Sequence, residues 1–193
     1  MTAESPATES NDWKSSAATD GSHERIFQGA NTLLLQGETL LKGISTEHYS
    51  ARVPMAMGGS IGTHYRHCLD HFVSLLRTGT GPLVDFDLRD RDPRIETDPD
   101  QALALTQQIR AALAEWNPQD LVRTVGTRCE ISYAPGTSPV TVSTLGRELA
   151  YAIAHAIHHF AIIAILGRLQ GIELPEEFGM APSTLAHLRQ KAT

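Results

Sequence analysis

Hydrophobic residues recur at helical spacing in four long segments of the chain. One face of an α-helix is built from positions i, i+3, i+4 and i+7, so this spacing predicts a helix that buries one side. The run from Ile61 through Tyr65, Leu69 and Phe72 to Leu76 is an example. The predicted helices cover residues 24–42, 60–77, 102–116 and 144–169. The pattern therefore predicts a mainly helical fold with four main helices.

The segments between these helices carry different patterns. Residues 122–142 place β-branched residues on both sides of the turn A-P-G-T-S-P, which is typical of a β-hairpin. We therefore expect a small β-hairpin inserted before the last long helix. Residues 45–59 are predicted to form a loop and residues 84–94 a long charged connection. A short capped helix is expected to begin near Ser183.

Length and composition indicate one domain with a disordered tail. A chain of 193 residues can bury a sizeable core. Residues 1–22 are rich in Ser, Thr, Ala and Asp and are predicted to be disordered, which leaves residues 23–193 as the helical domain. The tail has no apolar core, so it does not resemble a signal peptide. The net charge of −6 and the lack of an Arg/Lys cluster argue against nucleic-acid binding.

Two further features bear on localisation. Cys68 and Cys129 are far apart and form no C-x-x-C pair, which favours a reducing, cytoplasmic setting. Residues 149–166 contain no Asp, Glu, Lys or Arg and are almost long enough to span a bilayer. Three histidines near the centre of that segment would be costly in lipid. We interpret the segment as a helix buried inside a helical bundle, and we expect no membrane association.

Six of the nine histidines lie in two of the predicted helices. They are His64, His67 and His71 in one helix, and His155, His158 and His159 in the other. At about 100° per residue each set falls on one side of its helix, with His158 turned sideways. Two histidines at i, i+4 can bind one transition-metal ion. If the two faces meet, they form a metal site; a purely structural, histidine-rich core is the alternative.

The spacing singles out three of these histidines as metal ligands, namely His67, His155 and His159, with His64 or His71 as a fourth group. Three neutral imidazoles leave one coordination position open, which a catalytic metal needs. His71 or His64 is then the candidate catalytic residue, acting as a proton shuttle. The run H155-A-I-H-H159 lacks the glutamate of H-E-x-x-H, which argues against a zinc protease of that type.

Other polar residues are candidates for supporting roles. Glu148 precedes His155 by seven residues and shares its helix face, so it could orient a ligand or accept a proton. Asp70 and Cys68 point away from the ligand face. Three arginines in the charged connection could bind a carboxylate substrate, although pairing with the aspartates of that segment is favoured. These arginines are Arg89, Arg91 and Arg94, and the aspartates are Asp85, Asp87, Asp90 and Asp92.

The two histidine motifs resemble those of the DinB/YfiT-like superfamily of metalloenzymes. S60-I-G-T-H-Y-R-H67 resembles the family's second helix, and H155-A-I-H-H159 resembles the H-x-x-x-H pair of its fourth, over residues 24–171 in all. The resemblance implies a four-helix bundle, frequently a homodimer, with zinc, nickel or iron on His67, His155 and His159. Family members include S-transferases that use low-molecular-weight thiols and isomerases of the maleylpyruvate type. The chain departs from the family in its hairpin, its C-terminal tail and its extra histidines.

These observations lead to two functional hypotheses. The first is a metal-dependent enzyme in which a divalent ion lowers the pKa of a bound water or thiol, as in a thiol S-transferase or a hydrolase acting on a small molecule. Thiol transfer ranks above hydrolysis on the family resemblance alone. The second is a non-catalytic metal-binding or stress-response protein whose extra histidines close the coordination shell. The sequence identifies neither the metal nor the substrate.

Overall fold

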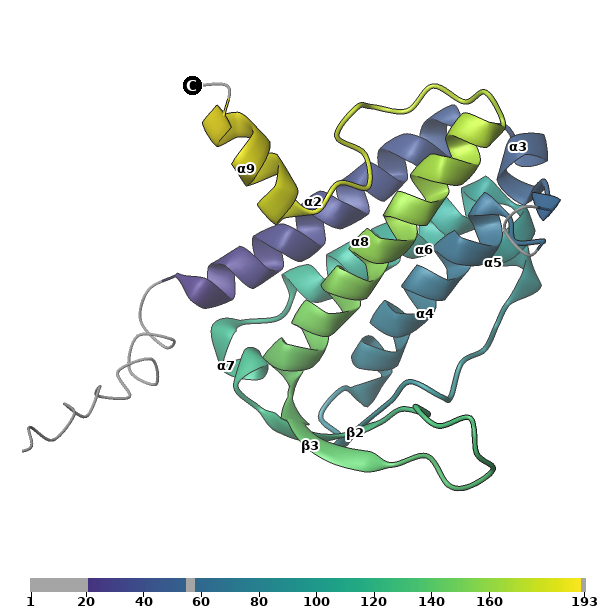
Figure 1. Ribbon diagram of the computed structural model, residues 1–193. Coiled ribbons are helices and arrows are strands. Elements are labelled where there is room, and N and C mark those ends of the chain that lie inside the picture. Colours follow the sequence, from purple (N-terminus) through teal and green to yellow (C-terminus); the bar gives the residue numbers. More distant parts are fainter. Residues whose placement is uncertain (1–20, 55–57, 192–193) are drawn as a thin grey trace, which may run out of the picture.

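The structure is a computed structural model that describes residues 21–54 and 58–191, and it is mainly helical with one small sheet. Four long helices lie side by side (Figure 1). They are α2 (Ser22–Gly43), α4 (Ile61–Thr78), α6 (Pro99–Ala114) and α8 (Leu145–Leu169). The prediction of a mainly helical chain is confirmed. Most of the segment predicted to be disordered lies outside the described residues, but Ser22 already belongs to α2.

Shorter helices occupy the connections. The segment predicted as a loop contains one helix and a second begins at the end of the charged connection; the hydrophobic pattern missed both, because each is about one turn long. Ser45 and Asp92 accept hydrogen bonds from backbone N–H groups at the starts of two of them. The short C-terminal helix was predicted. The short helices are α3 (Thr46–Ser50), α5 (Pro93–Thr97), α7 (Pro118–Leu121) and α9 (Pro182–Lys191).

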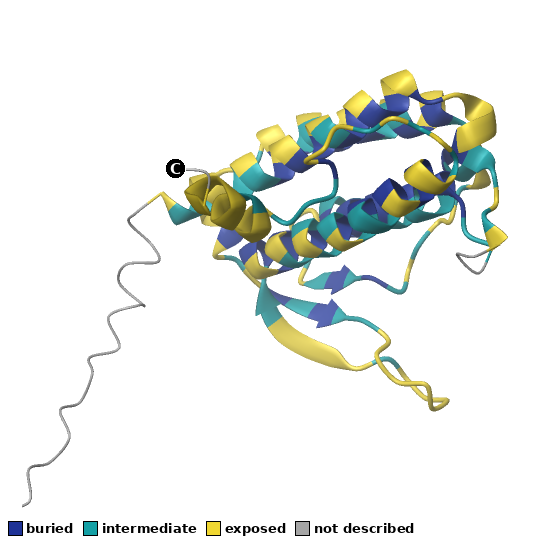
Figure 2. Ribbon diagram, turned by 45° about the horizontal axis from the view of Figure 1, so that its top comes forward, coloured by how far each residue is buried: buried dark blue, intermediate teal, exposed yellow. Residues whose placement is uncertain are grey.

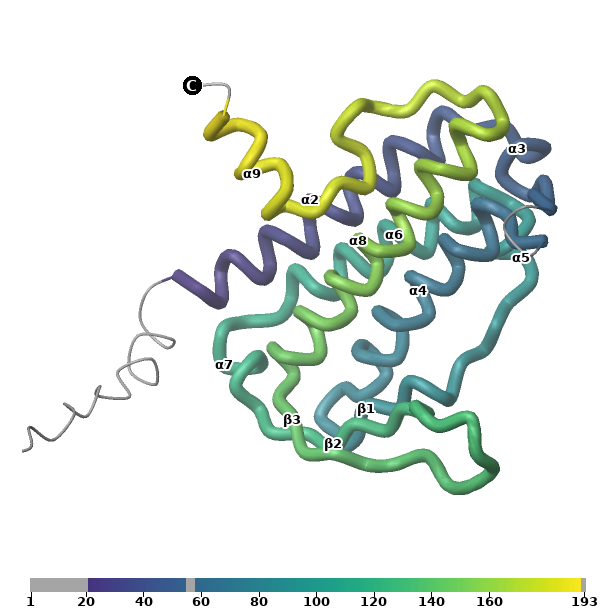
Figure 3. Tube along the Cα trace, in the orientation of Figure 1, coloured from purple at the N-terminus to yellow at the C-terminus, as the bar shows by residue number. Residues whose placement is uncertain are grey.

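The predicted hairpin is part of a three-stranded sheet. Strands β2 (Thr124–Arg128) and β3 (Val140–Thr144) pair antiparallel, directly before α8 as expected. Strand β1 (Leu83–Asp85) then adds to β2 in parallel and gives the order β1-β2-β3 (Figure 3). The charged residues after β1 concealed this strand in the sequence. Its central residue, Val84, is fully buried.

The core fixes the distance between α4 and α8. Tyr65 of α4 stacks on Phe160 of α8 with ring centroids 5.8 Å apart, and both rings are buried. Gly37 of α2 makes room for this pair, because a Cβ there would collide with the Tyr65 hydroxyl. Burial of two aromatic side chains contributes several kcal/mol, at roughly 25 cal/mol per Å² of apolar surface. The packing therefore holds the two histidine-bearing helices together.

Helix α8 is apolar over much of its length. It is long and apolar enough to cross a membrane by length and composition alone, a test that the core helix of a soluble protein also passes. In the structure it packs against both α2 and α4. Exposed residues concentrate instead on α9 and on the outer side of the hairpin (Figure 2). The apolar character of α8 thus coincides with the packing of one of its sides against α2 and α4.

Candidate metal centre

Helices α4 and α8 bring the two histidine sets face to face. Helix α4 leads into the sheet and α8 leads out of it, so the two helices run in opposite directions. The histidines pair accordingly. His64 Nδ1 lies 3.0 Å from His159 Nδ1, and His67 Nε2 lies 2.9 Å from His155 Nε2. The expectation that the two faces meet is therefore confirmed.

Three of these rings lie within metal-binding distance. One nitrogen from each of His67, His155 and His159 can be chosen so that all lie within 4.8 Å of one another. Two nitrogens bound tetrahedrally to one zinc ion lie roughly 3.3 Å apart, since each Zn–N distance is about 2.0–2.1 Å. The 2.9 Å between His67 and His155 needs only a small adjustment to reach that value. The geometry thus fits the three predicted ligands.

The imidazole rings of the triad are in the neutral state that metal binding requires. Burial, followed by neighbouring positive charge, lowers the pKa of His67 to about 4 and the pKa of His159 to about 3. Burial also lowers the pKa of His155. Imidazole must be neutral to bind a metal, so these rings are ready to do so at neutral pH without losing a proton first.

His71 lies beside this triad but outside it. Its ring is 4.2 Å from that of His155, centroid to centroid, and it packs against Phe86 and Tyr151. It is 5% exposed, and neither ring nitrogen has a hydrogen-bond partner among the described residues. Burial lowers its pKa to about 3. His71 is thus a neutral imidazole held in a mostly aromatic pocket with no polar partner.

Of the other candidate residues, one reaches the triad and the rest lie apart from it. His64 is half-buried and reaches the site through His159, whereas His158 is exposed. Glu148 is buried on α8, but it accepts a hydrogen bond from Ser143 Oγ at 2.5 Å instead of contacting a histidine. Cys68 is buried in the core, as its position away from the ligand face suggested.

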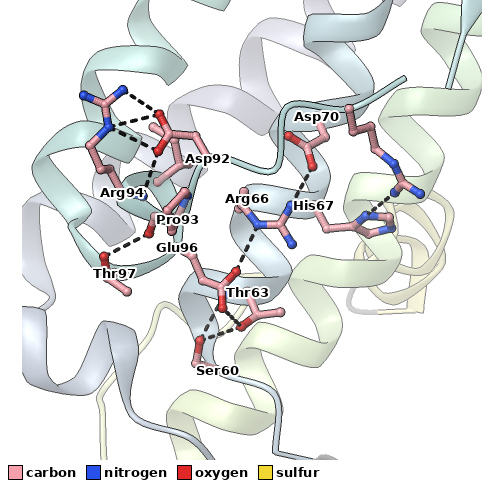
Figure 4. Close-up of polar contacts among 12 residues, drawn as sticks. Ser60, Thr63, Arg66, His67, Asp70, Asp92, Pro93, Arg94, Glu96 and Thr97 are labelled. Atoms are coloured by element: carbon pink, nitrogen blue, oxygen red, sulfur yellow. Dashed lines mark hydrogen bonds and ion pairs between the residues drawn. The ribbon is translucent and has the colours of Figure 1, made fainter. Parts of the chain in front are cut away.

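Asp70 belongs to a polar network on the neighbouring face of α4 (Figure 4). Arg66 donates to Asp70 at 2.8 Å and to Glu96 at 3.1 Å, and Thr63 donates to Glu96 at 3.1 Å. Glu96 lies on α5, so the network ties α5 to α4 next to His67. These contacts could not be predicted from the sequence, because nothing in the local pattern indicates where α5 packs.

Arg89 does not pair with an aspartate as predicted. Of the pairs expected within the charged connection, Arg94–Asp92 forms at 2.7 Å, whereas Asp85 and Asp90 pair with arginines outside it, Arg128 at 2.8 Å and Arg77. Arg89 instead places Nη1 3.0 Å from Nδ1 of His67. Arg89 lies four residues after β1, which packs against α4, and the local sequence pattern does not reveal this packing.

Comparisons with known proteins leave the family open. No family model matches the chain, and no solved structure matches it. A curated relative, FK506-binding protein 5 of Rhizopus delemar, is 31% identical over 109 residues. The matched part is 56% of this chain, but the chain spans only 28% of that protein's length.

Proposed function

We propose that the protein is a metal-dependent enzyme of the DinB/YfiT-like type, with zinc, nickel or iron bound by His67, His155 and His159. The observation that carries the proposal is the approach of three ligand nitrogens to within 4.8 Å of one another. Together with the two histidine motifs, it favours the fold of that family, a four-helix bundle formed by α2, α4, α6 and α8.

The candidate site supplies three neutral nitrogen donors. Among the described residues, the group that can share one ion contains the three histidines and no carboxylate. Three protein ligands leave an open position, as in catalytic zinc sites. When bound, a divalent ion there supplies Lewis acidity, which lowers the pKa of a water or a thiol. This favours a thiol S-transferase or a hydrolase.

The other histidines would move protons at this site. His64 shares a hydrogen bond with His159 and is half-buried, so it connects the triad to the surface. His71 is buried against His155 with both nitrogens unpartnered. A ring with a free donor and a free acceptor can hand a proton to a group that enters the site. We assign His64 and His71 this role.

The proposed substrate, localisation and oligomeric state follow from the resemblance to the DinB/YfiT-like superfamily. A small molecule, with a low-molecular-weight thiol as the preferred class, is the expected substrate. A cytoplasmic homodimer is the expected form. Oligomeric state by light scattering and thiol consumption in the presence of electrophiles test these parts separately from metal binding.

Metal analysis of protein purified without a histidine tag tests the site. We expect one ion per chain, and loss of that ion in His155→Ala. His158→Ala is the matched control, because His158 lies on the same helix, is exposed and is outside the triad. Wild-type protein without stoichiometric metal after incubation with zinc, nickel or iron(II), or a His155→Ala variant that keeps its metal, would contradict the proposal.

The position of His71 favours a second candidate, a non-catalytic metal-binding protein. A fourth imidazole so near the triad could close the coordination shell after a small movement. A saturated ion cannot bind substrate. X-ray absorption on the loaded protein separates the two functions: a four-nitrogen shell that loses one nitrogen in His71→Leu indicates storage, whereas an unchanged shell supports the enzyme.

A further inference from the structure

Arg89 differs from the other arginines of this region in its polar contacts. Three nearby arginines, Arg66, Arg77 and Arg94, form ion pairs with acidic side chains. Arg89 forms no ion pair within the described part of the chain; its nearest polar partner is the ring of His67, and its Nε atom is buried without a partner. An arginine is a strong binder of carboxylates and related oxyanions, because its donors form a planar fork.

A cavity large enough for a small molecule lies beside Arg89. Arg89 lines a cavity of about 320 Å³, which also has an apolar part formed by Val73, Leu88 and Leu105. The acidic residues of its lining are Asp70, Asp90 and Asp92, and each is paired with an arginine. Arg77 and Arg94 of the lining are paired with Asp90 and Asp92, so Arg89 is the arginine of this lining that has no carboxylate partner among the described residues. A volume of this size can accommodate a small organic molecule.

The contact between Arg89 and His67 conflicts with metal binding. A guanidinium can only donate, so Nδ1 of His67 must be the acceptor in this contact. The neutral ring then carries its hydrogen on Nε2, the atom that faces His155. A histidine that binds a metal through Nε2 carries its hydrogen on Nδ1 instead, where it normally donates to an acceptor. Arg89 therefore has to leave Nδ1 when His67 becomes a ligand.

We propose that Arg89 binds an oxyanion group of the substrate in this cavity and that its movement from His67 to the anion favours metal binding. The inference rests on the proposed function and adds the substrate class, a small molecule with a carboxylate or a similar oxyanion. Because binding linkage is reciprocal, the anion raises the affinity for the metal as much as the metal raises the affinity for the anion.

Metal affinity measured with and without a simple anion tests the inference. The untagged full chain is titrated with Co²⁺ against a competing indicator, in chloride buffer and then with propionate or sulfate, with correction for Co²⁺ bound by the anion. For the wild type we expect each effective anion to tighten metal binding by about fivefold or more. A larger effect of propionate identifies an organic carboxylate as the ligand, and a larger effect of sulfate identifies an inorganic oxyanion.

Substitutions assign the effect to Arg89. In Arg89→Met we expect tighter Co²⁺ binding without anion and no further gain from propionate or sulfate, because no guanidinium occupies Nδ1. Arg89→Lys keeps the charge and should retain part of the anion dependence. Arg94→Met is the control, since it removes the same charge from the same segment but leaves His67 untouched. Circular dichroism confirms that each variant is folded.

The outcomes separate this inference from the proposed function. Wild-type protein that binds no Co²⁺ contradicts the metal site, and the inference falls with it. Wild-type protein that binds Co²⁺ with an affinity independent of both anions contradicts the inference alone. The same holds if Arg89→Met keeps the anion dependence, or if Arg94→Met loses it to the same extent.

Discussion

Two pairs of helices bury polar side chains between them, and they do so in opposite ways. Between α2 and α6, Glu38 is 4% exposed and is paired with Arg110 and with Lys42. Between α4 and α8, the histidine cluster contains rings of one kind, and His71 has no partner for either nitrogen. Burying a polar group costs free energy unless it is hydrogen-bonded. The carboxylate buried in the first cluster is paired, whereas the second cluster leaves both ring nitrogens of His71 without a partner among the described residues.

The largest expected effect is stabilisation of the histidine cluster by a metal. A ligand that binds only the folded state at 100 times its Kd stabilises it by about 2.7 kcal/mol. For a chain of this size that corresponds to a rise in Tm of about 5–10 °C. We expect zinc to produce this rise in the wild type and in His158→Ala, but not in His159→Ala, when measured by differential scanning calorimetry. Equal rises in all three proteins would rule out the triad as the binding site.

The next largest effect is expected at the α2–α6 pair, where loss of one charged partner should lower the free energy of unfolding. Glu38→Gln leaves Arg110 without a counter-ion and should lower the free energy of unfolding by about 2 kcal/mol, at the lower side of the values for buried pairs because Arg110 is partly exposed. Urea denaturation measures this change, and zinc should not affect it. The double variant Glu38→Gln/Arg110→Met should recover part of the loss. A double variant whose loss equals the sum of the two single losses would show that the pair is not coupled.

The same pair gives the α2–α6 cluster a pH dependence. Burial raises the pKa of Glu38, but hydrogen bonds from Arg110 and Lys42 outweigh it, so the pKa of the folded protein is lowered overall. A carboxyl whose pKa is lower in the folded state contributes stability that is present above its unfolded pKa of about 4.3. That contribution is lost as the pH falls through the folded pKa. The stability difference between wild type and Glu38→Gln, from urea curves between pH 7 and pH 3, should therefore shrink below about pH 4.3; a constant difference would refute the pairing.

The sequence could predict the contacts that are local along the chain, but not those between residues that are far apart in it. The i, i+4 spacing of His155 and His159 is local, and so is the helix start at Ser60, whose side chain accepts a hydrogen bond from the Thr63 N–H. These features were predictable. The position of Arg89 was not, because it depends on β1 pairing with β2, about forty residues further along the chain. Neither was the pairing of Glu38 with Arg110, which depends on how α2 and α6 pack.

The smallest expected effect concerns His71, and its sign is opposite to that of Glu38. His71 is buried among Phe86, Tyr151 and His155 with both nitrogens unsatisfied, so its burial costs free energy that no hydrogen bond returns. Replacing it by leucine, which has a similar volume and no polar atom, should stabilise the metal-free protein by about 1 kcal/mol in urea denaturation. A destabilisation of the same size would mean that the ring nitrogens have a partner in solution, such as an ordered water, and that the histidine cluster is as complete as the α2–α6 pair. Stabilisation by leucine would instead show that His71 lowers the free energy of unfolding of the metal-free protein. Residues that are retained for function often have this effect.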